Sequence, residues 1–195
     1  MRLSQPRISP LSDDQLDADQ EAVLAPLRLV SLVNDSPGSV LNIFRTLAHA
    51  PKALVRFNDW GSYVLSRRSD LSPRQREIVV LRTGYLCKSG YEWTQHHRIG
   101  LQAGLGAEEI ERIKGGAAAG WSAAEAALIR ATDELHADQF ITVATWVELG
   151  AHFSAKQRMD VVFTCAQYTQ VSMILNTFGV QLEEGLTLDP DLKAY

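Results

Sequence analysis

The stretch LSPRQREIVVLRTGYLCKSGYEWTQHHRIGLQAG, from Leu71 to Gly104, decides the fold of this 195-residue chain. It opens with an S-x-x-Q capping box from Ser72 to Gln75, with proline at the first helical position. The apolar residues that follow cover most faces of a helix, which predicts a buried element. A second helix is predicted from near Ser89 to Gly104, where glycine favours a left-handed cap. The stretch therefore predicts two successive helices, the first of them in the core.

The rest of the chain predicts more helices and no strand. Capping boxes begin at Ser122 and Ser154, and Pro51 is suited to open another helix. No run alternates apolar and polar residues between hairpin turns. The long apolar run from Val161 to Val180 contains several polar residues, so we expect a core helix rather than a membrane span. The sequence predicts an all-α fold of about eight helices.

The chain divides into three parts by composition. Residues 1–38 are expected to form an arm and a short helix from Asp14 to Leu29 that Pro26 interrupts, followed by turn-forming residues from Asn34 to Gly38. Ser39 is expected to cap a helix through Ala48. Residues 39–182 form the predicted helical domain, and residues 183–195 form an irregular tail.

Charge and cysteine content limit the partners and the compartment. The net charge is -4, the isoelectric point is about 5.7 and no basic cluster is present, so nucleic acid is not an expected partner. The first residues lack the apolar core of a secretory signal, and no membrane association is expected. The two cysteines, Cys87 and Cys165, form neither a C-x-x-C motif nor a disulfide framework. A reducing, cytoplasmic setting is the simplest interpretation.

Ionisable residues within the organising stretch predict a catalytic site. Glu92 and His96 lie four residues apart, so they share one helix face and can touch. Glu77 adds a second carboxylate on the buried helix, where burial raises a carboxyl pKa unless the group is paired. Two carboxylates and an imidazole are components of proton-transfer chemistry.

Simpler interpretations stay open for each of these residues. Glu92 and His96 match an ordinary surface pair, and Glu77 could act on the helix dipole alone. A metal site is a weaker hypothesis because the H-E-x-x-H arrangement is absent. Ser89 could pair with His96 as a nucleophile or serve only as a helix cap, and aromatic residues such as Trp93 could line a pocket or pack in the core.

Four segments resemble the carboxymuconolactone decarboxylase family, which includes the alkylhydroperoxidase D-like proteins. They are REIVVLRTGYLCKSGYEWTQH from Arg76, NIFRTLAHAPKAL from Asn42, GWSAAEAAL from Gly120 and QYTQVSMILNTFGV from Gln167. The resemblance covers most of residues 42–182. It implies a compact helical domain that assembles into homotrimers or homohexamers.

The peroxidase branch of this family uses a Glu, a C-x-x-C pair and a His at fixed spacing. On this sequence the Glu and His fall on Glu77 and His96, while the cysteine positions hold Ser89 and Glu92. A serine and a carboxylate cannot form the disulfide that this route to peroxide reduction requires. The chain therefore resembles a member of the family that lacks the thiol pair.

The decarboxylase branch also lacks the thiol pair and works without a cofactor or metal. The resemblance implies that His96 donates a proton, Glu77 orients or tunes it, and Glu92 is a second acid or base. The expected substrate is a small carboxylated lactone or cyclic metabolite. The residues expected to bind it are Ser89, Tyr91, Trp93, Arg82 and Arg98.

Three classes of function follow from the sequence. The first is a cofactor-free carbon–carbon lyase of aromatic catabolism, or a related hydrolase or isomerase on the same residues. The second is a thiol peroxidase or disulfide reductase, which the cysteine placement disfavours. The third is a non-catalytic oligomeric binding protein, which would show a pocket without turnover.

Overall fold

The computed structural model describes residues 3–29 and 38–193. Within these ranges the chain forms α-helices, two short 3-10 helices and no strand, which confirms the all-α prediction. The α-helices number nine in the described residues, against the predicted eight or so. They are α1 (Ala18–Arg28), α2 (Asn42–Leu47), α3 (Pro51–Leu65), α4 (Pro73–Leu86), α5 (Gly90–Gln102), α6 (Ala107–Ile113), α7 (Ala123–Asp138), α8 (Val143–Gly150) and α9 (Ala155–Phe178).

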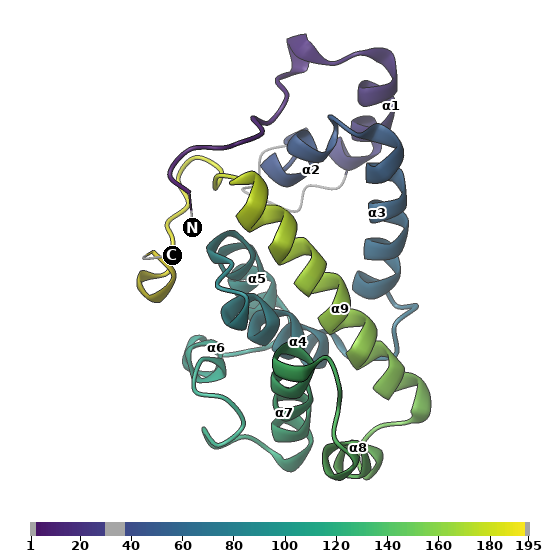
Figure 1. Cartoon of the computed structure of the whole chain (residues 1–195), viewed down its shortest axis with the longest axis vertical. Helices are drawn as coiled ribbons and strands as arrows, with labels where there is room; N and C mark the ends of the chain where they lie inside the picture. Colours follow the sequence, from purple (N-terminus) through teal and green to yellow (C-terminus); the bar gives the residue numbers. More distant parts are fainter. Residues whose placement is uncertain (1–2, 30–37, 194–195) are drawn as a thin grey trace.

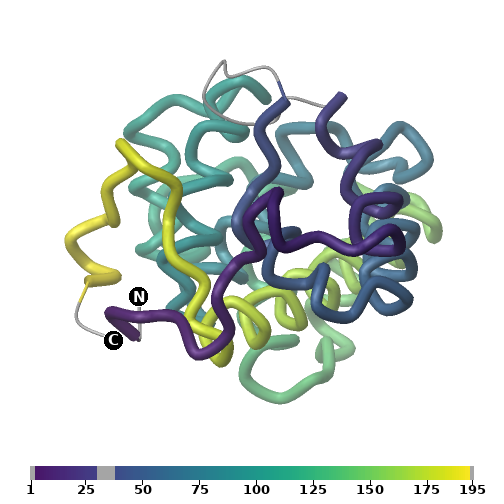
Figure 2. The backbone as a smooth tube through the Cα atoms, turned by 90° about the horizontal axis from the view of Figure 1, so that it is seen from above, coloured from purple at the N-terminus to yellow at the C-terminus, as the bar shows by residue number. Residues whose placement is uncertain are grey.

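Helix α4 lies at the centre and packs against α5, α7 and α9 (Figure 1). The long helix α9 crosses the molecule diagonally, with α1 to α3 on one side and α6 to α8 on the other (Figure 1). The first and last described segments run side by side near the end of α9 (Figure 2). There the Arg7 amide donates to the Phe178 carbonyl at 2.8 Å.

The burial of α4 follows from its sequence. Every residue from Glu77 to Gly84 is buried, as the apolar run predicts. The capping box is confirmed, because the Ser72 side chain accepts a hydrogen bond from the Gln75 amide. After α4 the chain turns through Lys88, whose φ is +55°, and the Ser89 amide donates to the Gly84 carbonyl at 2.9 Å. This short reversal brings α5 back against α4.

Predicted helix boundaries differ at several places. Helix α1 begins after its cap Asp17 and continues through Pro26, which the sequence interpretation expected to interrupt it. Helix α2 is capped by Leu41 rather than by Ser39. The predicted turn at residues 34–37 lies outside the described residues.

Helix α9 is the core helix that the sequence predicts. Its start at Ser154 is a capping box, and it ends at Gly179, whose φ of +69° gives the left-handed cap. Buried side chains recur along its whole length, from Asp160 to Leu175. Across the described residues, no helix is long and apolar enough to cross a membrane.

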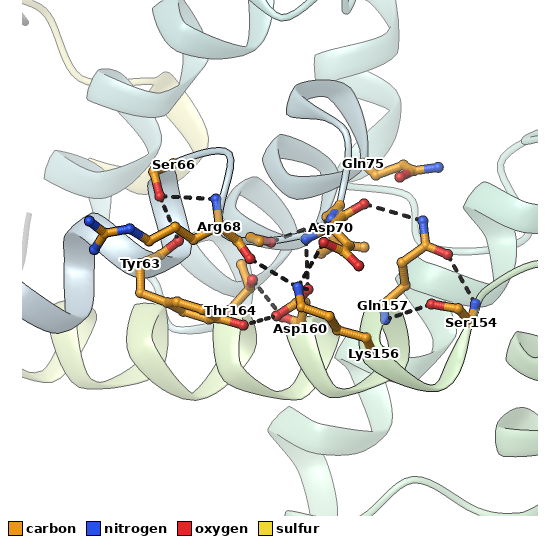
Figure 3. A network of polar contacts seen from close by, with 12 residues as sticks. Tyr63, Ser66, Arg68, Asp70, Gln75, Ser154, Lys156, Gln157, Asp160 and Thr164 are labelled. Atoms are coloured by element: carbon orange, nitrogen blue, oxygen red, sulfur yellow. Dashed lines mark hydrogen bonds and ion pairs between the residues drawn. The ribbon is translucent and has the colours of Figure 1, made fainter.

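A polar network fixes the loop before α4 to the first turns of α9 (Figure 3). Its centre is Asp160, which is 1% exposed. This carboxylate accepts hydrogen bonds from the Tyr63 hydroxyl at 2.7 Å, the Asp70 amide at 2.8 Å and the Lys156 ammonium at 3.1 Å. Charged hydrogen bonds of this kind are the stronger ones in proteins, so the network positions the start of α4.

Candidate active site

The structure brings Glu77, Glu92 and His96 together in one buried cluster. Their exposed fractions are 0%, 4% and 6%. His96 Nδ1 lies 2.6 Å from Glu77 Oε2, and His96 Nε2 lies 3.0 Å from Glu92 Oε1. The imidazole is therefore held between two carboxyl groups, away from bulk water.

Two adjacent helices position these side chains. Glu77 lies in the second turn of α4, while Glu92 and His96 lie one turn apart on α5. The helices approach closely at Gly84, where an added Cβ would lie 3.2 Å from Glu92 Cγ. Glycine at this position therefore lets Glu92 reach the imidazole.

The Glu92 carboxyl is the less satisfied of the two. Its contact with Nε2 does not have hydrogen-bond geometry, and within the described residues its Oε1 atom has no hydrogen-bond partner. Burial raises the pKa of Glu92 to about 7, with a further rise from Glu77 and an opposing effect from His96. Near neutral pH this group is therefore present in both the acid and the carboxylate form.

Opposing effects act on His96. Burial lowers the pKa of the imidazole, but the charges of Glu77 and Glu92 and the hydrogen bond to Glu77 raise it more. The net pKa of His96 is raised above its ordinary value. The ring also packs edge-on against Tyr168, with centroids 4.9 Å apart and planes at 81°. These contacts fix the orientation of the imidazole.

The guanidinium of Arg76 contacts the buried cluster. Its Nε atom lies 3.5 Å from Glu77 Oε1, the oxygen that is not bonded to His96. The Arg76 side chain is only 11% exposed. Each oxygen of Glu77 thus faces a different positive or protonatable group.

The residues predicted to bind substrate are distributed around α5. Ser89 is buried at its start, and its hydroxyl has no hydrogen-bond partner in the described chain. The Tyr91 hydroxyl donates to Glu183 Oε1 at 2.7 Å. Trp93 and Arg98 line a cavity of about 320 Å³ between α5 and residues 185–189. Only Ser89 of these four therefore offers an uncommitted buried polar atom.

Arg82 is not brought to the cluster. Its guanidinium binds Asp133 and the carbonyl oxygens of Ile113 and Lys114, both at 2.9 Å. These partners lie on the α6–α7 side of α4, so Arg82 holds that side of the fold together. The sequence indicated a cation on a buried helix but not the direction in which it points.

Three residues outside the predicted site contribute to the observed one. Arg76 could have been found, because it precedes Glu77 directly. Tyr168 lies on α9 among polar residues that the sequence left open between interhelical hydrogen bonds, a subunit contact and the same pocket. Glu183 accepts hydrogen bonds from the Asn42 amide and the side chains of Tyr91 and Gln95, and nothing local to the tail predicts it.

Comparison with known proteins agrees with this architecture. Residues 51–134, from α3 into α7, match the model of the carboxymuconolactone decarboxylase family. This range contains the three residues of the buried cluster. No curated protein matches the sequence.

Several solved structures share the fold over nearly the whole chain. A peroxidase-related protein with an alkylhydroperoxidase AhpD core from Ralstonia eutropha JMP134 is 19% identical, with a TM-score of 0.76, and the alignment covers 93% of this chain and 95% of that one. A peroxidase-related protein from Silicibacter sp. TM1040 is 16% identical, with a TM-score of 0.72 and coverage of 94% and 92%.

A debrominase, Bmp8, solved with 2,3,4-tribromopyrrole, is 12% identical, with a TM-score of 0.71 and coverage of 93% and 94%. Likenesses at these identities show the fold alone, and one fold hosts many reactions. Together with the family match, they confirm the resemblance seen in the sequence. Residues 51–134 match the model of the carboxymuconolactone decarboxylase family, and the chain is similar to that family without its C-x-x-C pair.

Proposed function

We propose that the protein catalyses cofactor-free acid–base chemistry, in the first place decarboxylation, on a small carboxylated lactone or cyclic metabolite. The observation that carries this proposal is the buried imidazole of His96 between Glu77 and Glu92. Catalytic acids work best with a pKa near the working pH, and Glu92 has a pKa of about 7. A simple surface pair would have neither this burial nor this pKa.

The hydrogen-bond pattern supports separate roles for the three groups. An ionised Glu77 accepts the proton on His96 Nδ1 and so fixes the ring orientation and tautomer. Glu92 Oε1 lies 3.0 Å from His96 Nε2, so the titrations of these two groups belong to the pair rather than to either residue. His96 and Glu92 form the donor side of the cluster, and Glu77 is its positioning residue.

In the proposed reaction the bond between a ring carbon and its carboxylate breaks. Carbon dioxide leaves, and the electron pair moves into the neighbouring unsaturated system of the substrate. A proton from the His96 and Glu92 side of the cluster is then transferred to carbon, which gives an enol-lactone with one carboxylate fewer than the substrate. No oxidant, reductant or metal takes part in this balance of atoms and electrons.

The thiol content supports this proposal over a peroxidase. Cys87 and Cys165 are not joined in a disulfide, and Ser89 and Glu92 occupy the positions of the family's cysteine pair. Reduced thiols agree with the reducing, cytoplasmic setting that we propose. A peroxide-consumption assay that compares the wild type with Cys87→Ser tests the peroxidase alternative directly.

Decarboxylation of 4-carboxymuconolactone, followed by the loss of ultraviolet absorbance, tests the proposed function. General acids contribute roughly 10²–10⁴-fold to rate, so His96→Ala should lose about that factor in kcat/KM. His152→Ala, an exposed histidine on the loop after α8, is the matched control. Equal activity in the wild type and His96→Ala would refute the assignment.

We further propose that the chain self-associates as a homotrimer or homohexamer. Phe140, Val143 and Val147 are 58%, 74% and 66% exposed on and beside α8. Contiguous exposed apolar side chains often mark interaction sites. Light scattering should give the mass of an oligomer for the wild type and of smaller species for Val143→Glu/Val147→Glu. A monomeric wild type would refute this proposal.

A further inference from the structure

A second cavity is lined in part by Arg76, the residue that also contacts Glu77 of the buried cluster. Its volume is about 840 Å³, within the range of small-molecule sites. It is formed by the loop between α3 and α4 together with the starts of α4 and α9. Ser66, Asp70, Ser154 and Gln157, which line it, are seen among the residues of the polar network in Figure 3.

The charges that line this cavity favour an anion. Arg67 and Arg76 are its two cations. Among the described residues, Arg67 is exposed and forms no ion pair. Of the described residues in the lining, Asp70 alone carries a carboxylate, and Lys156 neutralises it at 2.8 Å. The net charge offered to a bound molecule is therefore positive.

Arg76 has an unusual environment for a guanidinium. Only 11% of its side chain is exposed to solvent. Its one described contact is the 3.5 Å approach of Nε to Glu77, at the limit of a hydrogen bond. A nearly buried cation is costly unless it is well paired. Arginine presents two parallel donors that suit a carboxylate, and the cavity leaves room for one beside it.

We propose that this cavity binds the carboxylate of a small organic anion, with Arg76 as the principal contact and Arg67 as the second. That the anion is the substrate of the buried cluster rests on the proposed function. Arg76 then joins the two sites, because the same guanidinium faces the bound carboxylate and Glu77.

If Arg76 binds the ligand, ligand binding should change the pKa of His96. An arginine with only a structural role would not produce this change. The positive charge of Arg76 lowers the pKa of His96. A carboxylate bound to Arg76 compensates part of that charge, so its binding should raise the pKa of His96. The imidazole therefore holds its proton more strongly when the cavity is filled, which favours a proton donor at the moment a carboxylated ligand is present.

Calorimetric titration with glutarate, in a buffer free of carboxylate and phosphate, tests the binding site. Glutaramide, its neutral analogue, should not bind. Arg76→Gln should weaken glutarate binding at least tenfold, and Arg67→Gln should weaken it less. Arg56→Gln is the matched control, because Arg56 is 84% exposed and pairs with Asp59 on α3. Unchanged affinity in Arg76→Gln, equal loss in Arg56→Gln, or no binding by the wild type would each overturn the proposal.

Nuclear magnetic resonance titration of the His96 ring gives a second readout. Saturating glutarate should raise the pKa of His96 in the wild type and leave it unchanged in Arg76→Gln. A shift of the same size in both proteins would overturn the coupling through Arg76.

Failure of the two proposals can be told apart. His96→Ala should still bind glutarate with the wild-type affinity while losing turnover. If Arg76-dependent binding is found but no carboxylated lactone is turned over, the cavity stands and the proposed reaction fails. If turnover occurs and Arg76→Gln has the wild-type KM, the reaction stands and the cavity fails.

Discussion

The hydrogen bond between His96 Nδ1 and Glu77 Oε2, 2.6 Å long, joins two helices across nineteen positions of sequence. It is the shortest link between α5 and α4 in the buried cluster, and it leaves the other ring nitrogen directed at Glu92. One carboxyl group therefore orients the imidazole while the other lies beside its second nitrogen. This division of roles leads to separable predictions for Glu77 and Glu92.

Glu77→Gln should reduce kcat much more than it changes KM. Glutamine keeps the shape but removes the negative charge that stabilises the imidazolium, so the pKa of His96 should fall. We expect a loss of roughly 10²-fold or more in kcat, at the lower end of general acid–base effects. Steady-state kinetics with a pH profile measures both changes. A variant with normal kcat would show that Glu77 does not position His96.

Glu92→Gln should change how stability depends on pH. Because the folded-state pKa of about 7 lies above the ordinary value of 4.5, folding favours the protonated form. The stability contributed by this group is present below pH 4.5 and is lost as pH rises to about 7. The raised pKa of His96 acts in the same direction. At one pKa unit per 1.36 kcal/mol, the Glu92 effect is on the order of 3 kcal/mol.

Urea unfolding of the wild type and Glu92→Gln between pH 4 and pH 9 measures this effect. The free energy of unfolding should depend less on pH in Glu92→Gln than in the wild type. At alkaline pH the variant should be the more stable of the two relative to their difference at acidic pH. The activity of the wild type should fall above a pH of about 7, as the donor loses its proton. A difference in stability that is flat with pH would contradict the burial argument.

Gly84→Ala should disturb the approach of α5 to α4. The new Cβ would lie 3.2 Å from Glu92 Cγ, so the helices must separate by a few tenths of an ångström. Crowding of this kind costs about 1–3 kcal/mol, which exceeds the gain of about 1 kcal/mol in helix propensity. We expect lower stability and lower activity.

The matched control for this variant is Gly61→Ala. Gly61 lies within α3, and its added Cβ would meet no atom within 4 Å. This change should stabilise the protein by about 0.5–1 kcal/mol through helix propensity alone. Thermal denaturation of both variants is sufficient, and a stabilised Gly84→Ala would show that the helices are not in close contact there.

Asp160→Ala should be strongly destabilising. It removes the acceptor for the Tyr63 hydroxyl and the Asp70 amide, which lie in a partly buried network (Figure 3). Unsatisfied buried donors cost about 1–3 kcal/mol each, so a loss of roughly 3 kcal/mol is expected. Asp59→Ala, which removes one exposed ion pair on α3, should cost less than about 1 kcal/mol.

The outcome of these two unfolding measurements also bears on the proposed cavity. Since Asp70 and Gln157 line it, loosening the network should weaken glutarate binding as well. Equal stability losses in Asp160→Ala and Asp59→Ala would contradict the structural role that we assign to Asp160.

Local signals in the sequence predicted most of the fold. The capping boxes at Ser72 and Ser154 set helix starts that the structure confirms, because a cap depends only on residues within one turn. The meeting of Glu92 and His96 is also local, since residues four apart share a helix face. Ser39 was expected to act as a cap, and the helix instead begins at Asn42.

Features that depend on distant residues could not be predicted in this way. Arg82 was expected near the substrate, but its partner Asp133 lies 51 positions away in sequence. Glu183, in the predicted irregular tail, contacts Tyr91 and Gln95 on α5. No pattern within either segment carries this information, because it arises from how helices pack.

The contacts of Glu183 have a consequence for the order in which the chain assembles at the ribosome. Tyr91 and Gln95, on either side of Glu92 in α5, receive their carboxylate partner from a segment that is synthesised about ninety residues later. During translation α5 can dock on α4 while both side chains still lack this acceptor. We therefore expect α5, the helix that carries His96, to reach its final position only after the segment beyond α9 has been synthesised.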